Sequence, residues 1–222
     1  MTTNSKGSKQ LLIAALCLAA TAGSAFWTYR TQFAAPRFNV VLHRAIGRNL
    51  AQETARLLHE AGKVVIVSIE LRDLPELKVQ MDEFERALKQ FPKVVLEKSY
   101  KLETDDKPKY SFGSGLSGRR YVRIVNKNPG ADAIVSFIGA PSLTAEDVTQ
   151  LKASPKVIVE ARSADKLKKL FEQNLIQAAI VARFQFPTPI KGTPRNAQEW
   201  FDQRYQIVTT NNLAELPDGK EE

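Results

Sequence analysis

Six short runs rich in apolar and β-branched residues, separated by amphipathic segments, constrain the fold of this chain more than any other feature. The run at residues 64–69 is nearly continuous in valine and isoleucine, which is typical of a strand buried on both faces. Between the runs, apolar residues recur at helical spacing, as in Leu77, Met81, Phe84 and Leu88. This alternation predicts an α/β fold: an open, mostly parallel sheet with helices on both faces, in a Rossmann-like three-layer α/β/α arrangement.

The expected elements follow from this pattern and from local end signals. Gly62 is expected to stop the first helix, Thr144 and Ser163 to cap later helices, and Asn174 to adopt the left-handed conformation at a helix end. Strands are predicted at residues 64–69, 93–102, 133–138, 156–160, 177–182 and 205–209. Helices are predicted at residues 43–61, 74–90, 117–128, 163–173 and 197–203, with a short one beginning near 144.

An apolar run at residues 11–27 precedes the α/β pattern and contains no charged residue. As a helix it would reach about 26 Å at about 1.5 Å per residue, just short of a hydrocarbon core. The run extends to Trp27 and is followed by Tyr29. Aromatic residues at this end suit the interface of an uncleaved transmembrane anchor. A basic start and the small residues 22–25 also suit a signal peptide. We expect one N-terminal transmembrane helix, with a cleaved signal peptide as the alternative.

Both interpretations place the body of the chain outside the cytoplasm. The first predicts a single-pass protein of a bacterial inner membrane with a periplasmic body, and the second a secreted periplasmic protein. The single cysteine, Cys17, lies in the apolar run, and a body without cysteine suits an oxidising compartment. We expect a basic segment at 1–10, an anchor or signal at 11–29, a linker at 30–42, one α/β domain at 43–213 and a polar tail at 214–222.

Residue types that carry catalytic chemistry are sparse. The two histidines, His43 and His59, are sixteen positions apart, which is too far for metal ligands on one helix face, and the body has no cysteine for a zinc site. No G-x-S-x-G nucleophile turn is present. The net charge of +8 is spread among 24 acidic residues without a long basic run. We therefore predict no enzyme, no catalytic residue, no metal, no cofactor and no nucleic-acid partner.

A glycine-rich segment at residues 113–118 precedes Arg119 and Arg120. Its glycine spacing matches the first two glycines of a P-loop, but the two arginines replace the lysine and the hydroxyl residue that hold phosphate and magnesium. A helix N-terminus with two arginines can hold an anion. The segment is interpreted either as a weak anion site at Arg119 and Arg120 or as a flexible loop that leads into a helix.

The order of elements and several short motifs resemble one lobe of the type I periplasmic binding proteins, a fold shared with lac-repressor-type regulators. Residues 128–135 (Asn-Pro-Gly-Ala-Asp-Ala-Ile-Val) resemble the family's Pro-Asp-x-Asp-Ala-Ile entry into a central strand. Residues 205–213 (Tyr-Gln-Ile-Val-Thr-Thr-Asn-Asn-Leu) are similar to the closing Leu-Val-Thr-x-Glu-Asn. The resemblance covers residues 46–213, fits the C-terminal lobe best, and implies a site that closes on its ligand between two lobes.

Departures from the family pattern fall on its ligand-binding positions. Gln80 and Glu83 stand where the resemblance implies an arginine and a glycine, and residues 136–140 lack the aspartate that follows the central strand. A second family aspartate falls near Glu160, and a glutamine falls near Arg183. With one lobe expected, these departures favour a membrane-tethered solitary lobe that acts as an interaction or scaffold module, as a homodimer or with a protein partner.

The alternative hypothesis is a solute-binding module for a sugar or small metabolite in a transport or sensing system. Open α/β sheets bind ligands beyond the carboxyl ends of their strands. The proposed ligand-binding residues lie at or just after predicted strand ends: Glu70, Arg72, Ser136, Gly139, Glu160 and Arg162.

Overall fold

The structure is a computed structural model that describes residues 5–30, 38–69, 74–102, 116–161, 167–183 and 194–215. The chain divides into two compact units, Met1–Phe38 and Asn39–Glu222. Several sequence predictions fall outside the described residues: most of the linker, the Ser163 cap, the glycines at 113 and 115, and nearly all of the polar tail. The two units are described separately below.

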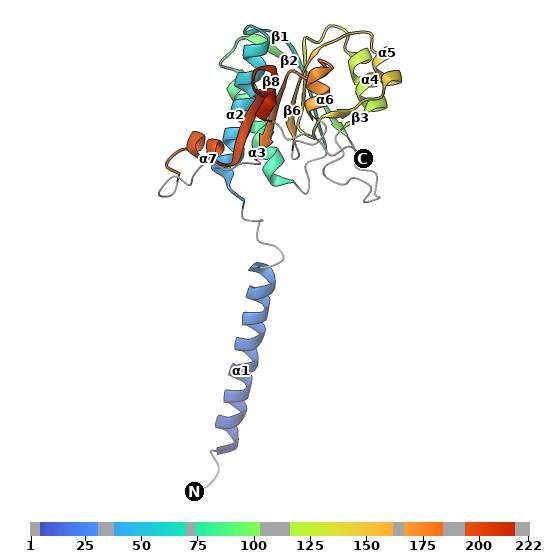
Figure 1. The fold of residues 1–222 in the computed structure, drawn as a ribbon. Coiled ribbons are helices and arrows are strands. Elements are labelled where there is room, and N and C mark those ends of the chain that lie inside the picture. Colours follow the sequence, from blue (N-terminus) through green and yellow to red (C-terminus); the bar gives the residue numbers. More distant parts are fainter. Residues whose placement is uncertain are drawn as a thin grey trace. The chain divides into compact units, whose positions relative to one another are not determined.

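The first unit contains helix α1 (Ser5–Thr28), which includes the apolar run (Figure 1). Its described apolar side chains are exposed, among them Leu12, Leu18 and Trp27. Within the part of the chain that the structure describes, no helix combines the length and the apolar character needed to cross a bilayer. The predicted transmembrane helix is thus not supported by the structure.

The second unit is built on a six-stranded sheet with the order β2-β1-β4-β6-β7-β8. The first five strands in this order are parallel, and β8 is antiparallel to β7. The α/β class and the open, mostly parallel sheet are therefore confirmed, and the last strand makes the sheet mixed. The strands are β1 (Ala61–Ile69), β2 (Lys93–Leu102), β4 (Ala133–Ser136), β6 (Lys156–Ala161), β7 (Ala178–Ala182) and β8 (Tyr205–Thr209).

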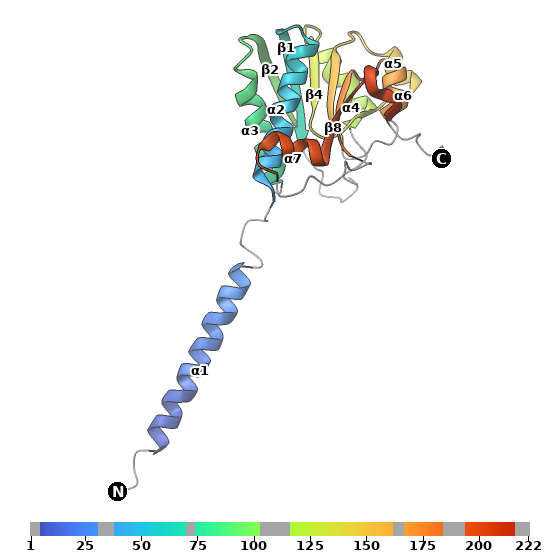
Figure 2. The ribbon, with the colours of Figure 1, turned by 60° about the vertical axis from the view of Figure 1, so that its left-hand side comes forward.

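Helices cover both faces of this sheet (Figure 2). Because side chains alternate along a strand, Val64 and Ile66 enter one hydrophobic cluster, and Val65 and Val67 enter the other. The helices that contribute to the first face are α2 (Val40–Leu57), α3 (Pro75–Leu88) and α7 (Ala197–Arg204). Those that contribute to the second face are α4 (Gly118–Lys127) and α6 (Leu167–Glu172), and the short α5 (Ala145–Thr149) contacts α4.

Helices α2 and α3 are held together by close backbone contact and by charge. A Cβ atom at Gly47 would lie 2.1 Å from the Gln80 carbonyl oxygen, so only glycine allows this approach. The Glu83 carboxylate, 5% exposed, accepts a hydrogen bond from Arg48 Nη2 at 3.0 Å and also pairs with Arg86. Glu83 stands where the family resemblance implies a glycine, and here it joins the two helices.

Most predicted elements are confirmed, some of them residue for residue. Strands β2 and β8 match the predicted ranges 93–102 and 205–209. Thr144 caps α5 through a capping box whose second member is Asp147. Asn174 adopts the left-handed conformation with φ 55°. These elements were predictable because their strand and cap signals are local in sequence.

The end of the first helix was predicted wrongly. Helix α2 ends at Leu57, because His59 and Glu60 both adopt positive φ values of 50° and 60° and turn the chain into β1. Gly62 consequently lies inside β1, with φ 147°. Two features were not predicted: a small parallel sheet of β3 (Leu116–Ser117) and β5 (Pro141–Ser142), and the 3-10 helix η2 (Thr210–Glu215).

Candidate functional site

The carboxyl edge of the sheet is the place where its parallel strands end and where the antiparallel β8 begins. Among the described strand residues, every buried polar side chain lies at this edge: Ser68 in β1, Ser136 in β4, Glu160 in β6 and Gln206 in β8. Burying a polar group is unfavourable unless the group is hydrogen-bonded. The other buried residues of these strands are hydrophobic. Because four buried polar side chains lie at one edge, we take this edge as the candidate site.

Ser136 and Gly139, two of the predicted site residues, are brought together in the turn after β4. The Ser136 hydroxyl donates a hydrogen bond to the Gly139 carbonyl oxygen at 2.6 Å and accepts a weak one from the Ile138 N–H at 3.4 Å. Gly139 has φ 96°, a conformation that favours glycine. In this structure both residues therefore shape the turn.

Glu160, another predicted site residue, lies one position before the end of β6 and is 7% exposed. It shares a strand face with Ile158, so it lies on the face covered by α2 and α3. On the same face, Phe137 directly follows β4, and its N–H donates to the Val67 carbonyl oxygen at 2.9 Å. The Phe137 ring meets Phe84 of α3 edge-on, with centroids 5.5 Å apart. This contact anchors the carboxyl edge to the first helical layer.

Two buried polar atoms at the carboxyl edge have no hydrogen-bond partner among the described residues: Ser68 Oγ and Gln206 Nε2. The other end of the Gln206 amide is occupied, because its Oε1 accepts a hydrogen bond from Arg183 Nη1 at 3.3 Å. Ser68 and Gln206 were missed as site residues. The only sequence signals were that Ser68 lies near the end of an apolar strand, and that Gln206 occupies an inward-facing position in a strand whose apolar and polar residues alternate.

Three predicted site residues, Glu70, Arg72 and Arg162, lie outside the described residues, so their role stays a prediction.

The predicted anion site lies at the first turn of α4. Arg119 lines a hollow of about 450 Å³ together with Glu146 and Asp147 of α5. Hydrogen bonds from the Thr144 backbone and hydroxyl lower the pKa of Asp147, and the charge of Arg119 acts in the same direction. With two carboxylates in its lining, the hollow offers an anion little net attraction. Anion binding by Arg119 and Arg120 stays a prediction that the geometry does not favour.

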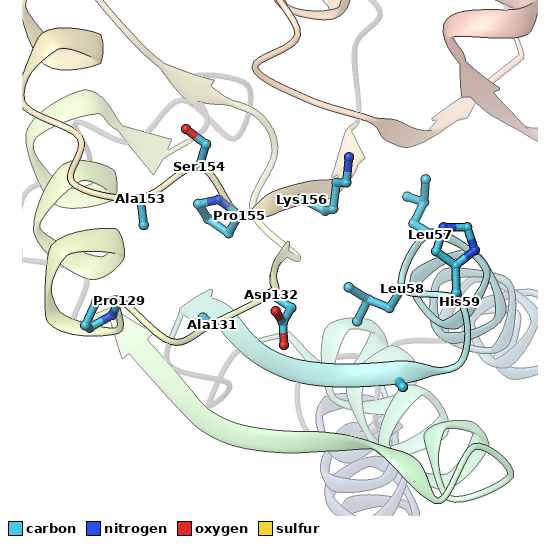
Figure 3. A pocket seen from close by; sticks show the side chains of 11 residues that line it. Leu57, Leu58, His59, Pro129, Ala131, Asp132, Ala153, Ser154, Pro155 and Lys156 are labelled. Atoms are coloured by element: carbon cyan, nitrogen blue, oxygen red, sulfur yellow. The ribbon is translucent and has the colours of Figure 1, made fainter.

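A second hollow, of about 460 Å³, lies at the opposite edge of the sheet, where β1 and β6 begin (Figure 3). Its lining is mostly apolar, with Pro129 on one side and Leu57 and Leu58 on the other, and it includes Lys156. Asp132, also in the lining, uses its Oδ2 to accept the Lys63 backbone N–H at 2.8 Å. At this amino edge, the Asp132 carboxylate is therefore already used by the protein's own backbone. Within the described ranges, no group of acidic, histidine and cysteine side chains could hold a metal ion.

No protein-family model matches the chain, and no curated protein matches its sequence. Its fold resembles that of an arabinose-binding protein from Geobacillus stearothermophilus, with 15% identity, a TM-score of 0.56, and coverage of 79% of this chain and 63% of that one. An ABC transporter solute-binding protein from Agrobacterium vitis, bound with α-D-tagatopyranose, gives 11% identity, a TM-score of 0.54, and coverage of 80% and 61%.

A solute-binding protein from Burkholderia graminis, in complex with D-arabinose, gives 19% identity, a TM-score of 0.51, and coverage of 77% and 61%. The predicted resemblance to type I periplasmic binding proteins is therefore confirmed for the fold. The chain spans about three fifths of the length of these structures. These similar proteins are binding proteins and not enzymes by their descriptions.

Proposed function

We propose that this protein is a solute-binding module, with a sugar or a similar small metabolite as its ligand, that serves a transport or sensing system. The observation that carries the proposal is the gathering of buried polar strand residues at the carboxyl edge, where open α/β sheets bind ligands. The fold is also that of solved sugar-binding proteins.

The chemistry of the edge fits a polyhydroxylated ligand. A sugar hydroxyl both donates and accepts hydrogen bonds, and a site for it needs both kinds of partner. Along this edge Ser68 of β1 offers a hydroxyl, Glu160 of β6 a carboxylate acceptor and Gln206 of β8 an amide donor. Three strands separate β1 from β8, so one small ligand would contact only part of this set. The predicted residues Glu70, Arg72 and Arg162 follow β1 and β6 in the sequence and complete the proposed set.

A test of this function measures unfolding of the full chain in mild detergent against a panel of pentoses, hexoses and nucleosides. A ligand at about a hundred times its Kd adds about 2.7 kcal/mol of stability, which moves the Tm by about 5–11 °C for a chain of this size, at about 2–4 °C per kcal/mol. Glu160→Gln should reduce the shift for an active sugar, whereas Glu146→Gln, on exposed α5, should not. A folded chain that gives no shift with any compound overturns solute binding.

A second function is proposed because the described α/β unit is built on one six-stranded sheet, whose carboxyl edge would cover a ligand from one side. One lobe leaves one side of a ligand uncovered, whereas binding pockets cover most of a ligand. A second copy or a protein partner would then cover the carboxyl edge, and the module would act in interaction or scaffolding. Crosslinking in intact cells that yields only monomers would exclude this function.

The location of the protein is part of the same proposal. Residues 11–29 carry the features of an export segment, and we propose that they deliver the α/β unit to the periplasm as a cleaved signal or a retained tether. The mass of the protein isolated from cells distinguishes the two outcomes. Protection of the α/β unit from added protease after the outer membrane is opened would contradict export.

A further inference from the structure

We propose that the solute bound at the carboxyl edge carries a carboxylate, as a sugar acid does, and that Arg183 and Gln206 hold this group together. This inference rests on the proposed solute-binding function and specifies the chemical class of the solute. It is carried by the fixed position of one guanidinium group and by one buried amide nitrogen for which the described residues supply no acceptor.

The Arg183 guanidinium is held at the carboxyl edge by its own strand and by the neighbouring one. Arg183 directly follows β7, and its backbone N–H donates to the Arg204 carbonyl oxygen at 2.8 Å. Its side-chain Nε donates to the Asp202 carbonyl oxygen at 2.5 Å. Its Nη1 donates to Gln206 Oε1 at 3.3 Å. The half-buried guanidinium is thus positioned without any ligand, which favours specific recognition.

The amide of Gln206 has its orientation set by this contact. Because the guanidinium can only donate, the amide oxygen must face Arg183 and the amide nitrogen must point the other way. That nitrogen is buried, and it has no acceptor among the described residues. Buried donors in folded proteins nearly always have a partner. An acceptor atom supplied by a ligand would satisfy it.

The charge of Arg183 also has no ion-pair partner among the described residues. None of the described carboxylates forms an ion pair with Arg183, and the nearby Asp202 carboxylate instead accepts a hydrogen bond from Gln198 at 2.8 Å. Arg183 and Gln206 lie on adjacent strands, where Val181 pairs with Gln206. The Arg183 guanidinium and the Gln206 amide nitrogen are therefore both hydrogen-bond donors, and the guanidinium is also cationic. Such a pair suits the two oxygens of a carboxylate better than it suits a neutral hydroxyl group.

The test measures the affinity of the full chain, in mild detergent, for matched pairs of neutral sugar and sugar acid: D-glucose with D-glucuronate, and D-galactose with D-galacturonate. We expect an acid to bind at least about tenfold more tightly than its neutral partner, as charge-assisted hydrogen bonds imply. Added salt should weaken binding of the acid more than that of the neutral sugar, because salt screens the charge interaction.

Arg183→Gln should remove the preference for the acid while binding of the neutral sugar changes little. Arg123→Gln is the matched control, because Arg123 is an exposed arginine of α4 and the substitution removes the same charge. Equal losses in both variants would show a general effect of net charge and would overturn the proposal.

Tighter or equal binding of the neutral sugar would also overturn the carboxylate proposal while leaving solute binding intact. If neither member of any pair binds to the folded chain, the proposed function fails for these sugars, and the carboxylate proposal fails with it.

Discussion

At the amino edge of the sheet, the Asp132 carboxylate accepts the Lys63 N–H at 2.8 Å, and Gln177 Oε1 accepts the Val157 N–H at 2.6 Å. At the carboxyl edge, Ser68 Oγ and Gln206 Nε2 are buried without a partner among the described residues. Both edges belong to the same strands, and both gather polar residues. They differ in that two buried polar atoms at the carboxyl edge have no partner among the described residues, whereas Asp132 and Gln177 at the amino edge accept hydrogen bonds from the backbone.

This difference separates a stabilising edge from a binding edge. Side chains that cap strand ends contribute to folding and need nothing more. Buried donors that lack acceptors lower stability, and proteins retain such groups mainly at functional sites. Substitutions at the two edges should therefore have opposite effects on stability and on ligand binding.

The largest effect is expected from Gly47→Ala, which disturbs the layer that supports the carboxyl edge. The new Cβ would lie 2.1 Å from the Gln80 carbonyl oxygen, so α2 and α3 must separate, and Phe84 would shift from Phe137. We expect the free energy of unfolding to fall by about 3 kcal/mol, as measured by denaturant titration. Gly130→Ala is the control, because its Cβ would meet nothing within 4 Å. Equal stability of the two variants would contradict the close approach.

At the amino edge, Asp132→Ala should lower the free energy of unfolding by about 1 kcal/mol, since the Lys63 N–H loses its acceptor. The affinity for the solute should stay unchanged, because the proposed binding site lies at the carboxyl edge and Asp132 lies at the amino edge. The same denaturant titration, together with a ligand titration, checks both parts. A marked loss of affinity in this folded variant would remove the functional distinction between the edges.

At the carboxyl edge, Ser68→Ala should leave stability unchanged or raise it by up to about 1 kcal/mol, because the substitution removes a buried hydroxyl that has no partner in the described part of the chain. The contrasting variant is Thr54→Val, in which the lost hydroxyl donates to the Leu50 carbonyl oxygen at 2.7 Å, so stability should fall. A loss of stability in Ser68→Ala similar to that in Thr54→Val would show that Ser68 is satisfied within the protein.

The smallest effect is expected away from both edges, at the exposed cap of α5. Hydrogen bonds from Thr144 lower the pKa of Asp147 below its ordinary value of 3.8. A carboxylate with a lowered pKa stabilises the folded chain above pH 3.8 and loses this contribution as the pH falls through its folded pKa.

Asp147→Asn should therefore lower the Tm slightly at neutral pH and less so in strong acid. Thermal unfolding of both forms across this pH range provides the measurement. A Tm difference that is independent of pH would assign the effect to packing and not to charge.

Much of the fold was predictable because its signals are local. The ranges of β2 and β8, the Thr144 cap and the left-handed Asn174 each depend on neighbouring residues in the chain. The site was predictable only in part. The positions of Ser136, Gly139 and Glu160 at strand ends followed from the sequence, and their role in binding stays a prediction. Ser68 and Gln206, which the structure adds to the candidate site, were not singled out by the sequence.

The sequence by itself determined the class of the fold, most of its elements and the edge at which a ligand is expected. These follow from the spacing of apolar residues and from the alternation of strands and helices along the chain. Only the tertiary structure decided the antiparallel direction of β8, the hydrogen bond that Asp132 accepts at one edge, and the lack of an acceptor for Gln206 Nε2 among the described residues at the other. The physical reason is that a hydrogen-bond partner depends on register between strands far apart in sequence. No local pattern encodes that register.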